Sequence, residues 1–101
     1  MRELRFSEKG AEIESFCRRW RIVEFALFGS VLREDFGQDS DVDVIVTFSE
    51  SAHHSLFELV TMEKELSGIF GRKVDMVEKS AIRNPFRRSE ILKTMELVYA
   101  A

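Results

Sequence analysis

The chain has 101 residues, which is the size of one ordinary domain and leaves no room for a second folded unit. Hydrophobic residues make up 45% of it and include nine Phe, so it can build a compact core and is not a disordered segment. The net charge of −3 argues against direct nucleic-acid binding, because such domains are usually strongly basic. We therefore expect a single domain over 1–101.

Cysteine content and hydropathy indicate the compartment. Cys17 is the one cysteine of the sequence and cannot form an intramolecular disulfide, which fits a reducing cytosol. No apolar run approaches the roughly 18–20 residues that cross a bilayer, and no signal-peptide stretch follows the N-terminal methionine. We expect a soluble, cytoplasmic protein without membrane contact.

The first predicted element is an amphipathic helix whose apolar stripe is formed by Ile13, Phe16, Cys17 and Trp20. Ser7 is its expected N-cap. A buried strand is predicted over 22–28, because this apolar run is short and rich in β-branched and aromatic residues. It ends at Gly29, and a short helical turn over 30–36 and a loop over 37–40 are expected next.

A second strand is predicted over 41–48, and a polar loop leads from it to the next helix. Ser55 and Glu58 form a capping box there, because each side chain can bond the backbone N–H of the other residue. The stripe of this helix consists of Leu59, Met62, Leu66 and Ile69. Gly68 or Gly71 is expected to end it.

The third predicted strand covers 73–77. Asn84 followed by Pro85 is a cap and first-turn pair, so a last helix is predicted there. Its stripe consists of Ile91, Leu92, Met95 and Val98. Helices and strands thus alternate, which predicts an α/β or α+β domain with a small mixed sheet flanked by about four helices.

Three aspartates occupy positions where carboxylates are unusual. Asp41 and Asp43 are two residues apart at the start of a strand, so their side chains point to the same side. Asp75 lies within the next strand, between two apolar residues. A carboxylate in a buried strand is costly unless it is paired or metal-bound, and clustered carboxylates repel one another. Oxygen ligands suit Mg²⁺, so we expect a magnesium site held by these three residues.

Gly29 and Ser30 follow a strand and open the predicted turn. A glycine lets the backbone approach a ligand closely, and N–H groups at a helix start favour phosphate. The serine hydroxyl adds a donor. Nucleotidyl transfer requires a phosphate-binding loop beside a carboxylate metal site, because metal ions neutralise the charge of the triphosphate.

The segment GSVLREDFGQDSDVDVIV resembles the signature of the DNA polymerase β-like nucleotidyltransferase superfamily, in which Gly-Ser is followed after ten residues by Asp-x-Asp. Arg33 and Ser40 match further common positions, and Asp75 stands where the third carboxylate is expected. The resemblance implies transfer of a nucleoside monophosphate from ATP. It implies Asp41, Asp43 and Asp75 as catalytic and metal-binding residues for two Mg²⁺ ions. Nucleotide contacts are implied for Gly29, Ser30, Arg33 and Ser40.

The chain is also similar in size to the minimal nucleotidyltransferases encoded beside HEPN-domain proteins. This resemblance implies an antitoxin that adds AMP to a tyrosine of a HEPN toxin, as in type VII-like toxin–antitoxin pairs. Two alternatives stay open: a small-molecule nucleotidyltransferase of the aminoglycoside-modifying kind, and a non-catalytic antitoxin that neutralises its partner by binding.

Other polar clusters have simpler interpretations. The basic cluster at 18–21 suits the end of the first helix and needs no ligand. The arginines at 83–88 flank the start of the last helix, where the helix dipole opposes them and a nucleotide or partner contact is the alternative. His53 and His54 are expected to be solvated, and Cys17 is expected in the core.

Overall fold

The computed structural model describes residues 10–29 and 41–101. In these residues the helices are α2 (Gly10–Trp20), α3 (Leu56–Phe70) and α4 (Pro85–Thr94), with a 3-10 turn, η2, over Lys79–Ala81. The strands are β1 (Ile22–Phe28), β2 (Val42–Phe48), β3 (Val74–Glu78) and β4 (Glu96–Ala100). None of these helices is long and apolar enough to cross a membrane. The predicted cap at Ser7, turn over 30–36 and loop over 37–40 lie outside the described residues.

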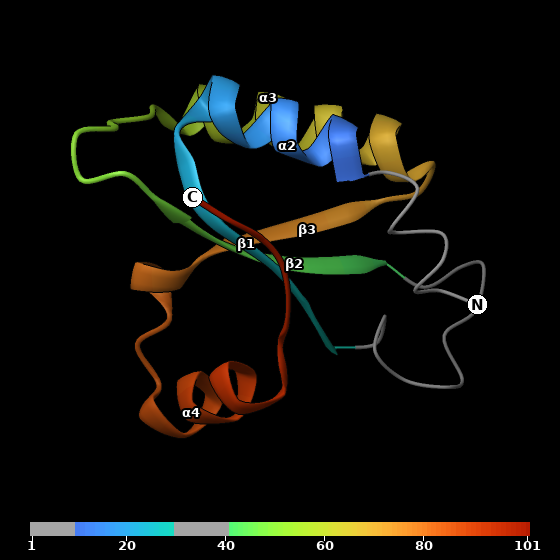
Figure 1. The fold of residues 1–101 in the computed structure, drawn as a ribbon. Coiled ribbons are helices and arrows are strands. Elements are labelled where there is room, and N and C mark those ends of the chain that lie inside the picture. Colours follow the sequence, from blue (N-terminus) through green and yellow to red (C-terminus); the bar gives the residue numbers. More distant parts are fainter. Residues whose placement is uncertain (1–9, 30–40) are drawn as a thin grey trace.

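The four strands form one mixed sheet in the order β3-β2-β1-β4. β1 pairs antiparallel with both β2 and β4, whereas β2 and β3 run parallel. Figure 1 shows α2 and α3 side by side on one face of the sheet and α4 on the opposite face. The predicted α/β class with a small mixed sheet is therefore confirmed.

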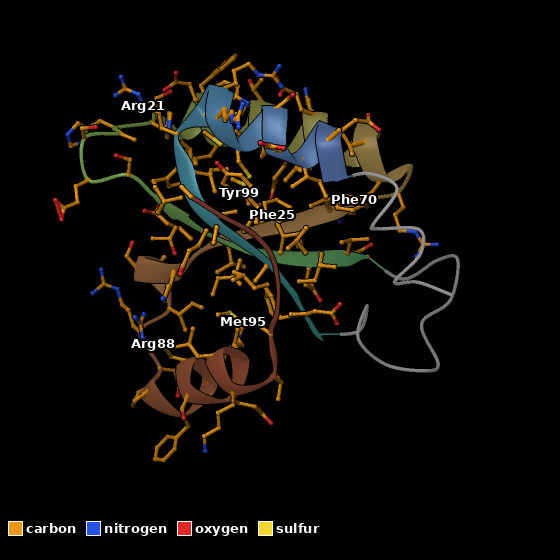
Figure 2. The ribbon with its side chains drawn as sticks, viewed as in Figure 1. Arg21, Phe25, Phe70, Arg88, Met95 and Tyr99 are labelled. Atoms are coloured by element: carbon orange, nitrogen blue, oxygen red, sulfur yellow. The ribbon has the colours of Figure 1, made fainter. Side chains whose placement is uncertain are left out.

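Each face of the sheet has its own core, because strand side chains alternate between the faces. The core beneath α2 and α3 consists of Ile13, Phe16, Cys17, Ile22, Phe25, Leu27, Val42, Val44, Val46, Met62, Leu66, Phe70 and Val74. The core beneath α4 consists of Ala26, Phe28, Ile45, Ile82 and Ile91. Figure 2 shows Phe25, Phe70 and Tyr99 in the first layer and Met95 in the second.

The ends of α3 follow the local signals of the sequence. Ser55 Oγ accepts from the Glu58 N–H at 3.1 Å, and the Glu58 carboxylate accepts from the Ser55 N–H at 2.8 Å. The predicted capping box is thereby confirmed. At the other end Gly71, with a left-handed φ of 72°, donates its N–H to the Ser67 carbonyl at 2.8 Å. The helix therefore ends at Gly71, the second of the two predicted positions.

The start of α4 is also as predicted. The Asn84 side chain accepts from the N–H groups of Phe86 and Arg87 at 2.9 and 3.2 Å, and Pro85 occupies the first turn. These bonds satisfy two of the N–H groups that a helix start leaves without intrahelical partners.

The residues after α4 form a strand, not the helix end that was predicted. The predicted apolar stripe ran to Val98, but α4 ends at Thr94 and β4 follows, so this part of the prediction is wrong. On β4, Tyr99 lies opposite Phe25 of β1. The apolar, β-branched and aromatic residues of β4 suit a strand. Their pairing satisfies backbone groups that β1 would otherwise expose at its edge.

Candidate active site

Gly29 directly follows β1 and has a left-handed φ of 76°. A Cβ atom built at this position would lie 2.5 Å from Oδ2 of Asp43 and 3.4 Å from its Cγ. Two constraints therefore favour glycine: L side chains rarely adopt this φ, and a methyl group would collide with the carboxylate. The group that lies close to Gly29 within the chain is Asp43. The approach of the Gly29 backbone to a phosphate stays a prediction.

Asp43 and Asp75 lie directly opposite each other in the parallel pair β2–β3. Their strand neighbours Val44 and Val74 pack into the core beneath α2 and α3, so both aspartates belong to the sheet face that carries α4. Asp43 is half-buried and Asp75 is exposed. Neighbouring strands are about 4.8 Å apart, so two carboxylates from different strands are adjacent on one face.

Asp41 lies just before β2, two residues ahead of Asp43, and is half-buried. The N–H of Val42 donates to the Lys73 carbonyl at 2.9 Å, which ties this end of β2 to the start of β3. Within residues 10–29 and 41–101, no group of three or more His, Cys, Asp or Glu side chains is gathered as a metal site. The structure thus pairs Asp43 with Asp75 and places Asp41 at the adjoining strand end, without assembling all three carboxylates around one point.

The paired carboxylates fit a divalent cation. Mg²⁺ is usually held by one or two carboxylates together with water and substrate phosphates. Asp43 and Asp75 supply such a pair, and the lack of a Cβ at Gly29 lets the Asp43 carboxylate lie against the backbone there. A cation at this position also removes the repulsion between the two negative charges. The site suits a metal ion that shares its coordination with a phosphate group.

Ser30, Arg33 and Ser40, the other predicted nucleotide-binding residues, lie outside the described residues. Their roles stay predictions from the motif. Gly29 gives the one described position of the predicted phosphate-binding loop, and it places the end of β1 next to Asp43.

His54 is not the solvated residue that was predicted, although its neighbour His53 is exposed as expected. The His54 side chain is only 12% exposed. Its Nε2 lies 2.7 Å from the Trp20 carbonyl oxygen, and its ring contacts those of Trp20 and Phe48 at centroid distances of 5.7 and 4.8 Å. His54 therefore ties the loop after β2 to the end of α2. A histidine in a polar stretch gives no signal of this contact, because Trp20 is 34 residues away in the sequence.

Two arginines of the basic cluster at the end of α2 form ion pairs within the protein. Arg18 forms an ion pair with Glu14, and Arg19 forms one with Glu65 of α3. The Trp20 indole N–H donates to the same Glu65 carboxylate at 3.0 Å. Arg19 and Trp20 therefore link α2 to α3 through Glu65, whereas the Arg18 pair lies within α2.

The arginines near α4 are divided between two environments. Arg88 donates to the Lys79 carbonyl at 2.8 Å, which ties α4 to η2. Arg83 and Arg87 are exposed, and neither takes part in the ion pairs seen among the described residues. These two side chains remain available to a ligand or partner.

Known proteins resemble this chain across most of its length. The profile of the family described as "Nucleotidyltransferase domain" matches residues 12–98. The chain is 37% identical over 83 residues to the "Protein adenylyltransferase MntA" of Thermococcus cleftensis, covering 80% of this chain and 77% of that protein.

Solved structures share the fold. A structure provisionally named as a minimal nucleotidyltransferase superposes with a TM-score of 0.72 at 29% identity, covering 91% of this chain and 89% of the other. A tri-AMPylated Shewanella oneidensis HEPN toxin in complex with an MNT antitoxin contains a chain that superposes with a TM-score of 0.66 at 14% identity, covering 100% of this chain and 74% of the other. At this lower identity the likeness concerns the fold alone.

Proposed function

The chain belongs to the nucleotidyltransferase-domain family, and from this we propose that it transfers AMP from ATP to a hydroxyl group of a partner HEPN toxin. In this proposal a tyrosine supplies the hydroxyl, and the modification makes the chain the antitoxin of a cytoplasmic toxin–antitoxin pair. Support comes from a relative named as a protein adenylyltransferase and from a fold neighbour in complex with an AMPylated HEPN toxin.

One observation carries the catalytic part of the proposal. Asp43 and Asp75 are register partners on one sheet face, and Asp43 lies against the Cβ-less Gly29. Nucleotidyl transfer needs carboxylates beside a place where the backbone can approach a triphosphate. When bound, two Mg²⁺ ions held by Asp41, Asp43 and Asp75 would supply neutralising charge to that triphosphate.

The remaining roles in the reaction are nucleotide binding and removal of the proton from the acceptor hydroxyl. We assign the contacts to ATP to Gly29, Ser30, Arg33 and Ser40. Asp75 is exposed on β3, an edge strand, so a hydroxyl carried by another protein can reach it from solvent. Its carboxylate takes the proton of that hydroxyl. The hydroxyl oxygen bonds to the α-phosphorus, the bond from this phosphorus to the bridging oxygen breaks, and pyrophosphate leaves.

The proposal is tested by incubating the chain with ATP labelled at the α-phosphate, Mg²⁺ and a HEPN-domain toxin. Intact-mass analysis should show addition of AMP to the toxin, and peptide mapping should place the label on a tyrosine. Label on a small molecule and never on protein would support an antibiotic-modifying enzyme instead. A toxin that is inhibited without any label would support neutralisation by binding alone.

A further inference from the structure

The start of α3 carries apolar side chains that no described part of the chain covers. Leu56, Phe57 and Val60 are 78%, 82% and 47% exposed. Because residues three and four apart are neighbours on a helix surface, Val60 adjoins both Phe57 and Leu56, and the three side chains form one patch. Single exposed apolar residues are ordinary, whereas a contiguous patch marks an interaction surface.

This patch borders a groove between α3 and the edge strand β3. A hollow of about 200 Å³ is lined by Leu56, Leu59, Val60, Glu63, Met76 and Glu78. A second hollow of about 230 Å³ shares Leu59 and Glu78 with the first and extends to His54. We call the two together the α3–β3 groove. Neither Asp43 nor Asp75 lines it.

The edge of β3 inside this groove is closed to a further strand. The N–H of Val74 donates to Ser67 Oγ at 3.2 Å, and the N–H of Met76 donates to the Glu63 carboxylate at 2.9 Å. A partner strand would need these donors to extend the sheet. An occupant of the groove must therefore bind through its side chains, as an amphipathic helix does.

The polar lining of the groove consists of two histidines, His53 and His54, and two carboxylates. Glu63 and Glu78 both line it, and neither takes part in the ion pairs formed among the described residues. Their charges are complementary to a helix that carries Lys or Arg beside its apolar face.

We propose that the α3–β3 groove docks an amphipathic, basic-edged helix of the protein that accepts AMP. The identity of this partner rests on the proposed function. Geometry favours the accepting protein as occupant. The groove residue Met76 and the proposed catalytic residue Asp75 are consecutive on β3, which is an edge strand, and they face opposite sides of the sheet. The groove and the proposed site are therefore separated only by the edge of one strand. A partner that binds the groove with one helix can extend past the edge of β3 and place its hydroxyl group next to Asp75.

The test measures binding without ATP, so that it does not depend on AMP transfer. The full chain is titrated calorimetrically with the same HEPN-domain toxin. The variant Phe57→Ser/Val60→Ser should bind at least about tenfold more weakly, because a few apolar anchor residues supply most of the binding free energy of an interface. Phe86→Ser is the matched control, since Phe86 is 85% exposed but lies on α4. It should bind like the wild type, and circular dichroism should show both variants folded.

The acidic part of the groove is tested with Glu63→Gln/Glu78→Gln. Glutamine keeps an oxygen that can accept from the Met76 N–H but removes the charge. This variant should bind the HEPN protein more weakly, and its affinity should depend less on salt than that of the wild type. Glu90→Gln, an exposed change on α4, should alter neither quantity.

The outcomes separate the groove from the proposed function. Unchanged affinity in the Phe57/Val60 variant, an equal loss in Phe86→Ser, or no binding by the wild type overturns the docking site. Sedimentation of the chain alone adds one check: if the Phe57/Val60 variant abolishes a homodimer but keeps partner affinity, the groove belongs to a second copy and the proposal is overturned. A wild type that binds through the groove but transfers no AMP contradicts the proposed function alone.

Discussion

Gly29 and Gly71 have nearly the same backbone conformation, with φ of 76° and 72°, in different surroundings. At Gly29 an added Cβ would meet the Asp43 carboxylate, whereas at Gly71 it would have no neighbour within 4 Å. The two positions therefore separate the cost of a left-handed backbone from the cost of a contact with the proposed site.

Alanine at either glycine should destabilise the protein by about 1 kcal/mol or more, because alanine does not readily adopt this φ. Gly29→Ala should in addition lose the rise in thermal stability that Mg²⁺ with ATP gives the wild type, since ligand binding to the folded state alone raises stability. Urea unfolding measures the first effect, and thermal melts with and without Mg²⁺-ATP measure the second. Full ligand stabilisation of Gly29→Ala would remove this residue from the site.

Asp75 is exposed while Asp43 is half-buried against Gly29, so the two carboxylates should contribute differently. Asp75→Ala should abolish AMP transfer while ATP affinity falls less than in Asp41→Asn/Asp43→Asn. The reason is that Asp75 is assigned to the acceptor hydroxyl and the other two to the nucleotide side. Calorimetric ATP titration with Mg²⁺ and labelled transfer measure the two effects. Equal loss of ATP affinity in both variants would contradict this division.

Burial raises the pKa of the Cys17 thiol from 9.0 to about 12. The pKa in the folded protein thus exceeds that of the unfolded chain, so the stability tied to this proton is complete below pH 9 and is lost as pH rises from 9 to 12. Because the thiolate is the reactive form, a thiol-specific reagent at pH 8 should label the native protein very slowly and the urea-unfolded chain promptly. Native labelling at the unfolded rate would place Cys17 outside the core.

At the residue scale, the sequence predicts best what depends on strand period and spacing. Asp43 and Asp75 could be predicted near each other because each is flanked by core residues of its own strand. That Asp43 lies against Gly29 required the pairing of β1 with β2. The contact of His54 with Trp20 depends on how a loop returns to a helix end, and no local pattern encodes it.

α3 and α4 begin where local side-chain bonds predict, and this can be tested at α3. Ser55→Ala removes the oxygen that accepts from the Glu58 N–H, and should lower the free energy of unfolding by about 1 kcal/mol. Ser89→Ala, an exposed change inside α4, should shift it by less than about 0.5 kcal/mol. Urea titration of the two variants measures both changes in the free energy of unfolding. Equal changes would show that the Ser55 cap does not stabilise α3.

At the scale of elements, β4 shows where pattern reading fails. The spacing of Ile91, Leu92, Met95 and Val98 suits one face of a helix. The helix nevertheless ends at Thr94 and the strand begins at Glu96, between the first and the last of these residues. What decides the outcome is the edge of β1, whose residues lie 69 to 76 positions earlier in the chain than their partners on β4. The other strands were predictable because the runs 22–28, 42–48 and 74–78 lie between clear turn or cap signals.

The whole molecule is built asymmetrically about its sheet. Among residues 10–29 and 41–101, the core beneath α2 and α3 contains 13 buried residues, whereas the core beneath α4 contains five, of which Ile91 is the buried residue of α4 itself. Stability should therefore differ between the two sides. Native-state hydrogen exchange should show α4 amides opening at a lower free energy than those of β1 and β2. Exchange of all three through one common global opening would contradict this asymmetry.

The parallel register of β2 and β3 links folding to catalytic competence. Side chains along a strand alternate between faces, so a slip of one residue would turn Asp75 toward α3 and push Val74 and Met76 into solvent. The hydrophobic effect that fastens β3 thus also aligns the two carboxylates. A chain in which β3 packs out of register therefore also loses the alignment of the two carboxylates. The proposed site is therefore correctly arranged only in molecules in which β3 has packed correctly.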